Sequence, residues 1–306
     1  MSKKIAFMGT SGFAVPILKN IYQNGFEISV VYTQPPKKSN RGQRITKSPI
    51  HILSETLNLN IRTPEKLLEN TIEYEYIKKI NLDLAIVVSY GQVIPKDYLK
   101  LSKNNFINIH ASILPKWRGA APIQRSIINL DKKTGISIMK INEKLDEGDV
   151  SKIFKLNILE NENAQSLSER LSVLASDKIT DIIDNIFEGN VNYRAQEHSN
   201  ATYAKKIDKS EGIIEWKEDA EKIIGKINGL YPSPGCFFIF KSERYKILKA
   251  ERSFTEGDPG TIINDRLEIC CGKESIKILE IQREGKKAQK ISEFITGSKI
   301  IKGTKL

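Results

Sequence analysis

Two polar side chains on one apolar segment have the types that acyl transfer requires. Asn108 and His110 stand two residues apart in the segment FINIH, residues 106–110. If this segment is a strand, both side chains lie on the same side of it, because side chains alternate along a strand with a period of two. An amide and a protonated imidazole that donate to one point can stabilise the oxyanion of a tetrahedral intermediate. The alternative is that both are hydrogen-bonded structural residues.

A carboxylate beside His110 would complete this chemistry. It would fix the tautomer of the imidazole and favour its protonated form, so that the histidine both stabilises charge and donates a proton. Asp146 and Asp149, in the segment KLDEGD, could each serve. The sequence has no serine or cysteine beside a base in a recognisable nucleophile elbow. Direct attack by a bound substrate amine is therefore favoured over a covalent acyl-enzyme.

Metal and dinucleotide chemistry have weaker support in the sequence. His51 and His198 are isolated, and neither a His-x-x-x-His pair nor a cysteine cluster is present. Asp146 with Asp149 alone is a poor ligand set, so we predict no metal site. The loop at residues 9–12 lacks the full G-x-G-x-x-G pattern, and a glycine turn after a first strand is usually only a turn. A dinucleotide site is an open but poorly supported alternative.

The elements that must position these residues alternate between strands and helices. Four strands are predicted, at residues 4–9, 27–34, 83–91 and 106–110. The helices between them are predicted at residues 13–25, 49–58 and 64–80. This alternation of strands and helices is typical of a doubly wound, mostly parallel open sheet. In such a sheet, ligands bind beyond the carboxyl ends of the strands. His110 falls at such an end.

Further elements complete this α/β domain and lead to a second one. A helix is predicted to follow residues 119–121, and strands without an intervening helix, and so antiparallel, follow at 136–142 and 149–158. A long helix is predicted at 164–187. The next stretch, residues 189–206, is polar and without periodicity, and we interpret it as a linker. It separates a domain of residues 1–188 from a domain of residues 207–306.

The second domain is predicted to be an all-β module with one helix, at residues 216–229. Its short strands recur at intervals typical of a small barrel. They are predicted at residues 236–240, 244–251, 260–264, 266–271 and 275–282. A chain of 306 residues is long enough for each of the two domains to bury its own core.

Composition indicates a soluble protein of a reducing compartment. Hydrophobic residues make up 40% of the chain and charged residues 28%. No unbroken apolar run reaches membrane-spanning length, so we expect no membrane partner. The cysteines, Cys236, Cys270 and Cys271, have no C-x-x-C spacing, and their odd number does not indicate a set of disulfides. A cytoplasmic protein without disulfides is therefore expected.

Basic residues gather in two stretches of a chain whose formal net charge is +11. Residues 33–47 carry no acid and five basic residues, namely Lys37, Lys38, Arg41, Arg44 and Lys47. Residues 283–306 carry seven basic residues against two acids, and Lys286 and Lys287 are among them. Clustered basic side chains attract phosphates, which indicates a polyanionic partner. The alternative is a solvated charge run in a protein from a generally basic proteome.

Several motifs, in one order, resemble the methionyl-tRNA formyltransferase family along nearly the whole chain. In the first domain they are FMGTSGFAVPIL, VYTQPPKKSNRGQR, VVSYGQVIP, NIHASILPKWRGAAPIQRS and KLDEGD. In the second part of the chain they are ATYAKKI, IEWKEDAEKI, YPSPG and LEIQREGKK. The combination is far more specific than any one of these motifs alone.

The resemblance implies a Rossmann-like formyltransferase domain followed by a small OB-like β-barrel. It implies transfer of a formyl group from 10-formyltetrahydrofolate to the α-amino group of methionine on initiator methionyl-tRNA. The family's catalytic amide, imidazole and carboxylate fall on Asn108, His110 and Asp146. Its folate-binding segment falls on Ser112, Ile113, Leu114 and Pro115. Its tRNA-acceptor loop falls on the basic stretch around Arg41 to Arg44, and the tRNA contacts we expect are Lys37, Lys38, Arg41, Arg44, Lys47, Lys286 and Lys287.

The sequence departs from the family pattern at four places. They are Ser11-Gly12, Ile113, Glu147 and Asn228-Gly229. The catalytic three are unchanged, so the expected mechanism is attack of the methionyl amine on the formyl carbon. Asn108 and protonated His110 are the oxyanion donors, and Asp146 holds His110 and helps to remove the amine proton. We expect a monomer. The alternatives are formyl transfer to a small amine, such as a nucleotide sugar or glycinamide ribonucleotide, and a non-catalytic nucleic-acid-binding protein.

Overall fold

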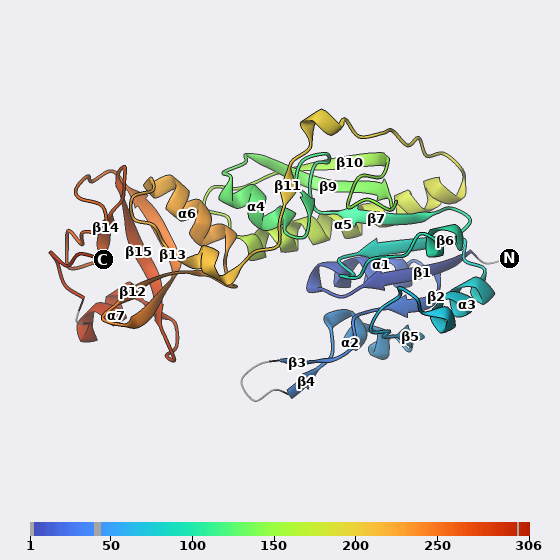
Figure 1. Cartoon of the computed structure of the whole chain (residues 1–306), viewed down its shortest axis with the longest axis horizontal. Coiled ribbons are helices and arrows are strands. Elements are labelled where there is room, and N and C mark those ends of the chain that lie inside the picture. Colours follow the sequence, from blue (N-terminus) through green and yellow to red (C-terminus); the bar gives the residue numbers. More distant parts are fainter. Residues whose placement is uncertain (1–2, 40–43, 299) are drawn as a thin grey trace. The chain divides into compact units, whose positions relative to one another are not determined.

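The segment that carries Asn108 and His110 is an inner strand of a seven-stranded sheet (Figure 1). The computed structural model describes residues 3–39, 44–298 and 300–306. The strand order across the sheet is β10-β9-β7-β6-β1-β2-β5. The bounds of these strands are β1 Lys4–Gly9, β2 Glu27–Tyr32, β5 Ile61–Arg62, β6 Leu84–Val88, β7 Phe106–His110, β9 Lys133–Lys140 and β10 Val150–Asn157.

Most of this sheet is parallel. β1 pairs in parallel with both β2 and β6, β2 with β5, and β6 with β7. β9 pairs antiparallel with β7. All residues of β6 are buried, as expected for a strand that helices cover on both faces of the sheet. The predicted open, mostly parallel sheet with an antiparallel addition is confirmed, and His110 is the last residue of β7.

The helices that connect the strands begin largely where the sequence places them. They are α1 Val15–Gln23, α2 Pro49–Thr56, α3 Thr71–Ile80, α4 Pro122–Ile128 and α5 Ala164–Phe187, with short 3-10 turns at Gly12–Ala14 and Tyr98–Lys100. Ser48 caps α2, since its Oγ accepts a hydrogen bond of 3.0 Å from the backbone N–H of His51, and Pro49 occupies the first turn. The predicted start of α2 and both predicted ends of α5 are confirmed.

Two predictions in this region are wrong. Helical spacing from residue 64 predicted too long a helix, because α3 begins only at Thr71, where the Asn70 side chain accepts a hydrogen bond of 3.1 Å from the N–H of Glu73. The basic stretch predicted as a loop contains a two-stranded antiparallel hairpin of β3 (Lys37–Ser39) and β4 (Arg44–Thr46). We call residues 37–39 and 44–46 the basic hairpin.

The chain forms two compact units. The first comprises residues 1–119, 135–156 and 168–203, and the second comprises residues 120–134, 157–167 and 204–306. Two short strands, β8 (Arg118–Gly119) and β11 (Tyr203–Ala204), pair with each other. The division into residues 1–188, a linker at 189–206 and residues 207–306 stays a prediction.

The second unit has an antiparallel sheet with the order β12-β13-β15-β14, and β16 pairs with β15. The strands are β12 Cys236–Phe240, β13 Glu243–Ser253, β14 Glu268–Cys270, β15 Ser275–Arg283 and β16 Gln289–Lys290. α6 (Ala220–Gly229) supplies apolar residues such as Ile223 and Ile227 to the core of this unit. Short helical turns lie at Lys209–Gly212, α7 Ile291–Phe294 and Ile295–Gly297. A β module with one principal helix is thus confirmed.

Details of the second unit differ from the sequence prediction. α6 begins at Ala220 rather than at Trp216, with Asp219 as its N-cap residue, and Trp216 lies before the helix as part of the core. Residues 260–264 make isolated bridges at Thr261 and Ile262 instead of a strand. Gly229 lies at a close approach of two helices, since a Cβ there would be 2.5 Å from Cγ1 of Ile128 on α4. A larger residue at this position would force α4 and α6 apart.

Within the described ranges, no helix combines the length and apolarity that crossing a bilayer would need.

Candidate functional site

Asn108 and His110 lie on the same side of β7, as the period of two predicts. The strand is held on both edges, by β6 in parallel and by β9 antiparallel, and Ser137 of β9 is the register partner of His110. The His110 side chain is 6% exposed. Both side chains are therefore fixed by an inner strand rather than by a loop.

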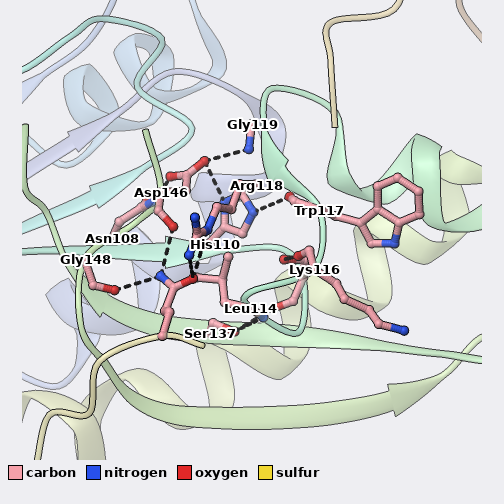
Figure 2. A network of polar contacts seen from close by, with 12 residues as sticks. Asn108, His110, Leu114, Lys116, Trp117, Arg118, Gly119, Ser137, Asp146 and Gly148 are labelled. Carbon is pink, nitrogen blue, oxygen red and sulfur yellow. Dashed lines mark hydrogen bonds and ion pairs between the residues drawn. The ribbon is translucent and has the colours of Figure 1, made fainter. Parts of the chain in front are cut away.

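The carboxylate of Asp146 brings the predicted residues together (Figure 2). Its Oδ1 accepts a hydrogen bond of 3.3 Å from Nδ2 of Asn108, and its Oδ2 lies 3.6 Å from Nδ1 of His110. The Asp146 backbone has a left-handed φ of +52°, which few residues other than glycine adopt. Asp149, the other candidate in the sequence, is exposed. The geometry thus selects Asp146.

The second ring nitrogen of His110 also faces an oxygen. Nε2 lies 2.9 Å from the backbone carbonyl of Trp117. A carbonyl can only accept, so the hydrogen of this bond is carried by Nε2. Nδ1 faces the Asp146 carboxylate, which is likewise an acceptor. Both ring nitrogens of His110 therefore face an oxygen acceptor.

Residues 117–119 support both catalytic candidates with their backbone. Trp117 offers its carbonyl to His110, and the N–H of Gly119 donates to Oδ2 of Asp146 at 2.8 Å. The segment is held in turn by Thr202, because Thr202 accepts hydrogen bonds of 2.9 Å from the N–H groups of Trp117 and Arg118. Residues of one short segment therefore contact both the imidazole and the carboxylate.

The predicted folate segment, residues 112–115, is rigidly connected to the sheet. Oγ of Ser137 donates to the carbonyl of Ser112 at 2.7 Å and accepts from the N–H of Leu114 at 3.1 Å. Ser112 and Leu114 are buried, and Oγ of Ser112 already donates to the carbonyl of Lys116 at 2.6 Å. Ile113 and Pro115 are partly exposed. Ile113 and Pro115 therefore have the more exposed side chains of the four.

Sequence reasoning missed the residues beneath the Asp146 loop. Arg118 is 1% exposed and Gln196 is 7% exposed, although both are polar. Nε and Nη2 of Arg118 donate to Oε1 of Gln196 at 3.0 and 2.8 Å, and Nη1 lies 3.5 Å from Glu147. Arg118 stands in the NIHASILPKWRGAAPIQRS motif, which was the one available signal. Gln196 falls in the stretch interpreted as a linker, where nothing in the sequence marks it.

A cavity of about 750 Å³ lies in the same unit. It is formed by β10, the second half of α5 and residues 190–197, together with Leu114 and Pro115. Asn108, His110 and Asp146 do not line it, whereas Gln196 does. The residues that can do the chemistry therefore lie outside this cavity. In the described part of the chain, no group of three His, Cys, Asp or Glu side chains is arranged to hold a metal ion.

The predicted tRNA contacts are surface residues where the structure describes them. Lys37 is exposed, and its Nζ donates to Oε1 of Gln34 at 3.1 Å. Lys47 pairs with Glu55 at 2.5 Å, and this hydrogen bond lowers the pKa of the Glu55 carboxyl below its ordinary value. Lys286 and Lys287 are exposed in the turn between β15 and β16. Arg41 and the side chains of Lys38 and Arg44 lie outside the described residues.

Comparisons with known proteins cover both parts of the chain. Residues 3–183 match the family model described as formyl transferase, and residues 206–299 match that of the formyl transferase C-terminal domain. The methionyl-tRNA formyltransferase of Pelagibacter ubique (strain HTCC1062) is 61% identical over 307 aligned positions, which cover 100% of this chain and 99% of the relative. That of Acidiphilium cryptum (strain JF-5) is 38% identical and covers 99% of both chains.

Solved structures support the same fold. A sugar 3N-formyl transferase, WlaRD, matches with a TM-score of 0.67 at 19% identity and covers 94% of this chain and 100% of its own. HypX from Aquifex aeolicus, solved in complex with tetrahydrofolic acid, matches with a TM-score of 0.67 at 14% identity. That match covers 96% of this chain and 47% of HypX, so this chain spans about half the length of HypX. At these identities the matches establish the architecture alone.

Proposed function

Because this chain belongs to the formyl transferase family, and methionyl-tRNA formyltransferases match it over its full length, we propose that it formylates initiator methionyl-tRNA. The formyl donor is 10-formyltetrahydrofolate, and the acceptor is the α-amino group of methionine. The product serves translation initiation. The observation that carries the proposal is the convergence of Asn108, His110 and Asp146 at the carboxyl end of β7.

The reaction forms one bond and breaks one. The amine nitrogen attacks the formyl carbon, the carbonyl oxygen becomes an oxyanion, and the bond between the formyl carbon and N10 of the folate then breaks. The amine gives up one proton and N10 gains one, so the reaction needs no redox partner. The step therefore requires a base for the amine proton and an acid for N10. The Asp146 carboxylate can serve as the base, and protonated His110 can serve as the acid.

Each of the three residues has a role that its contacts allow. One N–H of the Asn108 amide donates to Asp146, which leaves the other for the oxyanion. The Asp146 carboxylate stabilises the imidazolium of His110 and orients the ring. Nε2–H of His110 is bound to the Trp117 carbonyl, so it must be shared or released when it donates to the oxyanion. We propose that this hydrogen bond changes its acceptor when the substrate binds.

Substrate binding is assigned to two kinds of surface. For the folate we propose residues Ser112–Pro115, with Ile113 and Pro115 in contact through their side chains and Ser112 and Leu114 supporting them. For the tRNA we propose the basic residues predicted from the sequence, Lys37, Lys38, Arg41, Arg44, Lys47, Lys286 and Lys287. Exposed lysines and arginines attract the phosphate backbone without reading its sequence. We propose that the enzyme acts as a monomer in the cytoplasm.

The test is formyl transfer from 10-formyltetrahydrofolate to a panel of acceptors. The panel consists of initiator methionyl-tRNA, uncharged initiator tRNA, free methionine and a nucleotide-linked amino sugar. The proposal predicts transfer only to the charged tRNA. Transfer to the amino sugar alone would retain the chemistry and overturn the tRNA assignment. No transfer to any acceptor, with tRNA binding intact, would indicate a non-catalytic binding protein.

A further inference from the structure

The loop that carries Asp146 is held in an unusual shape. Asp146 has a left-handed backbone, and two residues later Gly148 lies so close to β9 that a Cβ there would be 1.9 Å from the carbonyl oxygen of Lys140. The position of the Asp146 carboxylate depends on this shape, because it must reach both Asn108 and His110. Something outside residues 146–148 must therefore fix the loop.

Gln196 makes the contacts that do so. Its Nε2 donates to the carbonyl of Asp146 at 2.9 Å and to the carbonyl of Gly148 at 2.8 Å. A primary amide has two N–H donors, and here each is used on one side of Glu147. The Gln196 side chain is 7% exposed, so little water competes for these bonds.

Arg118 fixes the orientation of this amide. Its Nε and Nη2 both donate to Oε1 of Gln196, at 3.0 and 2.8 Å. A flipped amide would point its oxygen at two carbonyls and its N–H groups at a guanidinium, which has only donors. The observed orientation is thus the one that satisfies every group. Arg118 is also flanked by Trp117 and Gly119, which contact His110 and Asp146.

We infer that Gln196 is a positioning residue for the formyl transfer, acting through the Asp146 loop under the control of Arg118. It touches none of the reacting atoms. Its function is to hold the carbonyls of residues 146 and 148, and so to keep the Asp146 carboxylate within reach of His110 and Asn108. Displacement of a catalytic group by about 1 Å can cost roughly 100-fold in rate. The inference rests on the proposed function.

The variant Gln196→Met tests it, because methionine has a similar length and no hydrogen-bonding group for the two carbonyls. We expect kcat to fall roughly 10- to 100-fold, with the KM for methionyl-tRNA changed by less than about threefold. The matched control is Asn104→Leu, since the Asn104 amide also supports a loop of this unit by donating to a carbonyl, that of Asp83, at 3.0 Å. We expect the control to keep wild-type kcat.

A double-mutant cycle separates positioning from general stability. If Gln196 acts through Asp146, then adding Gln196→Met to Asp146→Asn lowers kcat by less than about twofold further. A merely structural residue would lower kcat by the same factor in both backgrounds, and that result would overturn the inference. A kcat of Gln196→Met within about twofold of wild type would also overturn it.

A variant that fails to fold and a wild type without activity have different consequences. If Gln196→Met does not fold by circular dichroism, Gln196→Glu replaces it, because glutamate keeps an acceptor for Arg118 but cannot donate to the two carbonyls when ionised; the same decrease and the same cycle are expected. If wild-type protein transfers no formyl group to methionyl-tRNA, the proposed function fails and this inference with it. Active wild type with an unaffected Gln196 variant overturns only the positioning role.

Discussion

The Asp146 site and the basic hairpin both belong to the first unit, and they use charge in opposite ways. Around Asp146, the polar residues His110, Arg118 and Gln196 are buried. Gln196 accepts from Arg118 and donates to the carbonyls of residues 146 and 148. In the basic hairpin and directly after it, Lys37 and Lys47 are exposed and contact the surface residues Gln34 and Glu55. Buried, fully bonded groups fix a geometry, whereas exposed charges attract a partner without fixing one. The first region should therefore control kcat and the second should control tRNA affinity.

The largest effect should come from His110→Ala. It removes an oxyanion donor and the proton carrier together, and we expect kcat to fall about 1,000-fold. The KM for methionyl-tRNA should stay close to wild type, because no predicted phosphate contact is altered. Steady-state formylation with varied tRNA measures both constants. An effect confined to KM would show that His110 binds substrate and does not stabilise the transition state.

A smaller and different effect should follow from Lys37→Ala with Lys47→Ala. We expect the KM for methionyl-tRNA to rise several-fold with kcat unchanged. The dependence of log K on log salt should weaken by about one unit for each phosphate that the variant no longer neutralises. The measurement is tRNA binding and formylation at several salt concentrations.

The matched control for that variant is Lys66→Ala with Lys78→Ala. These lysines are also exposed, and they lie near Glu69 and Glu75 as Lys47 lies near Glu55, but they fall outside both basic stretches. If both pairs changed the tRNA KM equally, total charge rather than the hairpin would attract the tRNA.

A buried ion pair away from the site should affect stability alone. Glu73 on α3 accepts from Arg62 at 2.6 and 2.7 Å and from the hydroxyl of Tyr32 at 2.7 Å. Burial opposes ionisation of Glu73, but the hydrogen bonds from Arg62 and Tyr32 outweigh it and lower the pKa of the carboxyl below its ordinary 4.5. We expect Glu73→Gln to lower the free energy of unfolding at pH 7 by about 2 kcal/mol and to leave kcat unchanged.

The pH dependence of that effect has a definite sign. A folded-state pKa below the unfolded value adds stability that is fully present above the unfolded value, near 4.5, and is lost as the pH falls through the folded one. The difference between wild type and Glu73→Gln should therefore shrink below pH 4.5. Urea unfolding from pH 7 to pH 3 measures it. A difference that grows on acidification would contradict the assigned cause.

Local signals in the sequence were sufficient for much of the fold. The cap at Ser48 and the apolar run of β6 depend on neighbouring residues, and both were predicted correctly. The start of α3 was missed because the helix begins where the Asn70 side chain caps it, and not where the apolar periodicity begins. The basic hairpin was missed because each of its strands is only three residues long and half of the six residues are charged, so the sequence shows no apolar alternation with a period of two.

The site shows the same limit. Asn108 and His110 are two residues apart, so strand geometry alone places them together. The choice between Asp146 and Asp149 depends on the left-handed backbone of Asp146, which spacing does not reveal. The bond between Arg118 and Gln196 spans 78 residues, and Gln196 lies in an aperiodic stretch. Long-range contacts of this kind are set by the tertiary fold, which local patterns do not encode.

The most direct test of the central claim compares Asp146→Asn with Asp149→Asn. The two carboxylates stand three residues apart, and only that of Asp146 contacts Asn108, His110 and Gly119. We predict that Asp146→Asn lowers kcat for methionyl-tRNA formylation at least about 100-fold while Asp149→Asn stays within about twofold of wild type. Equal decreases in the two variants, or near-normal turnover of Asp146→Asn, would contradict the account.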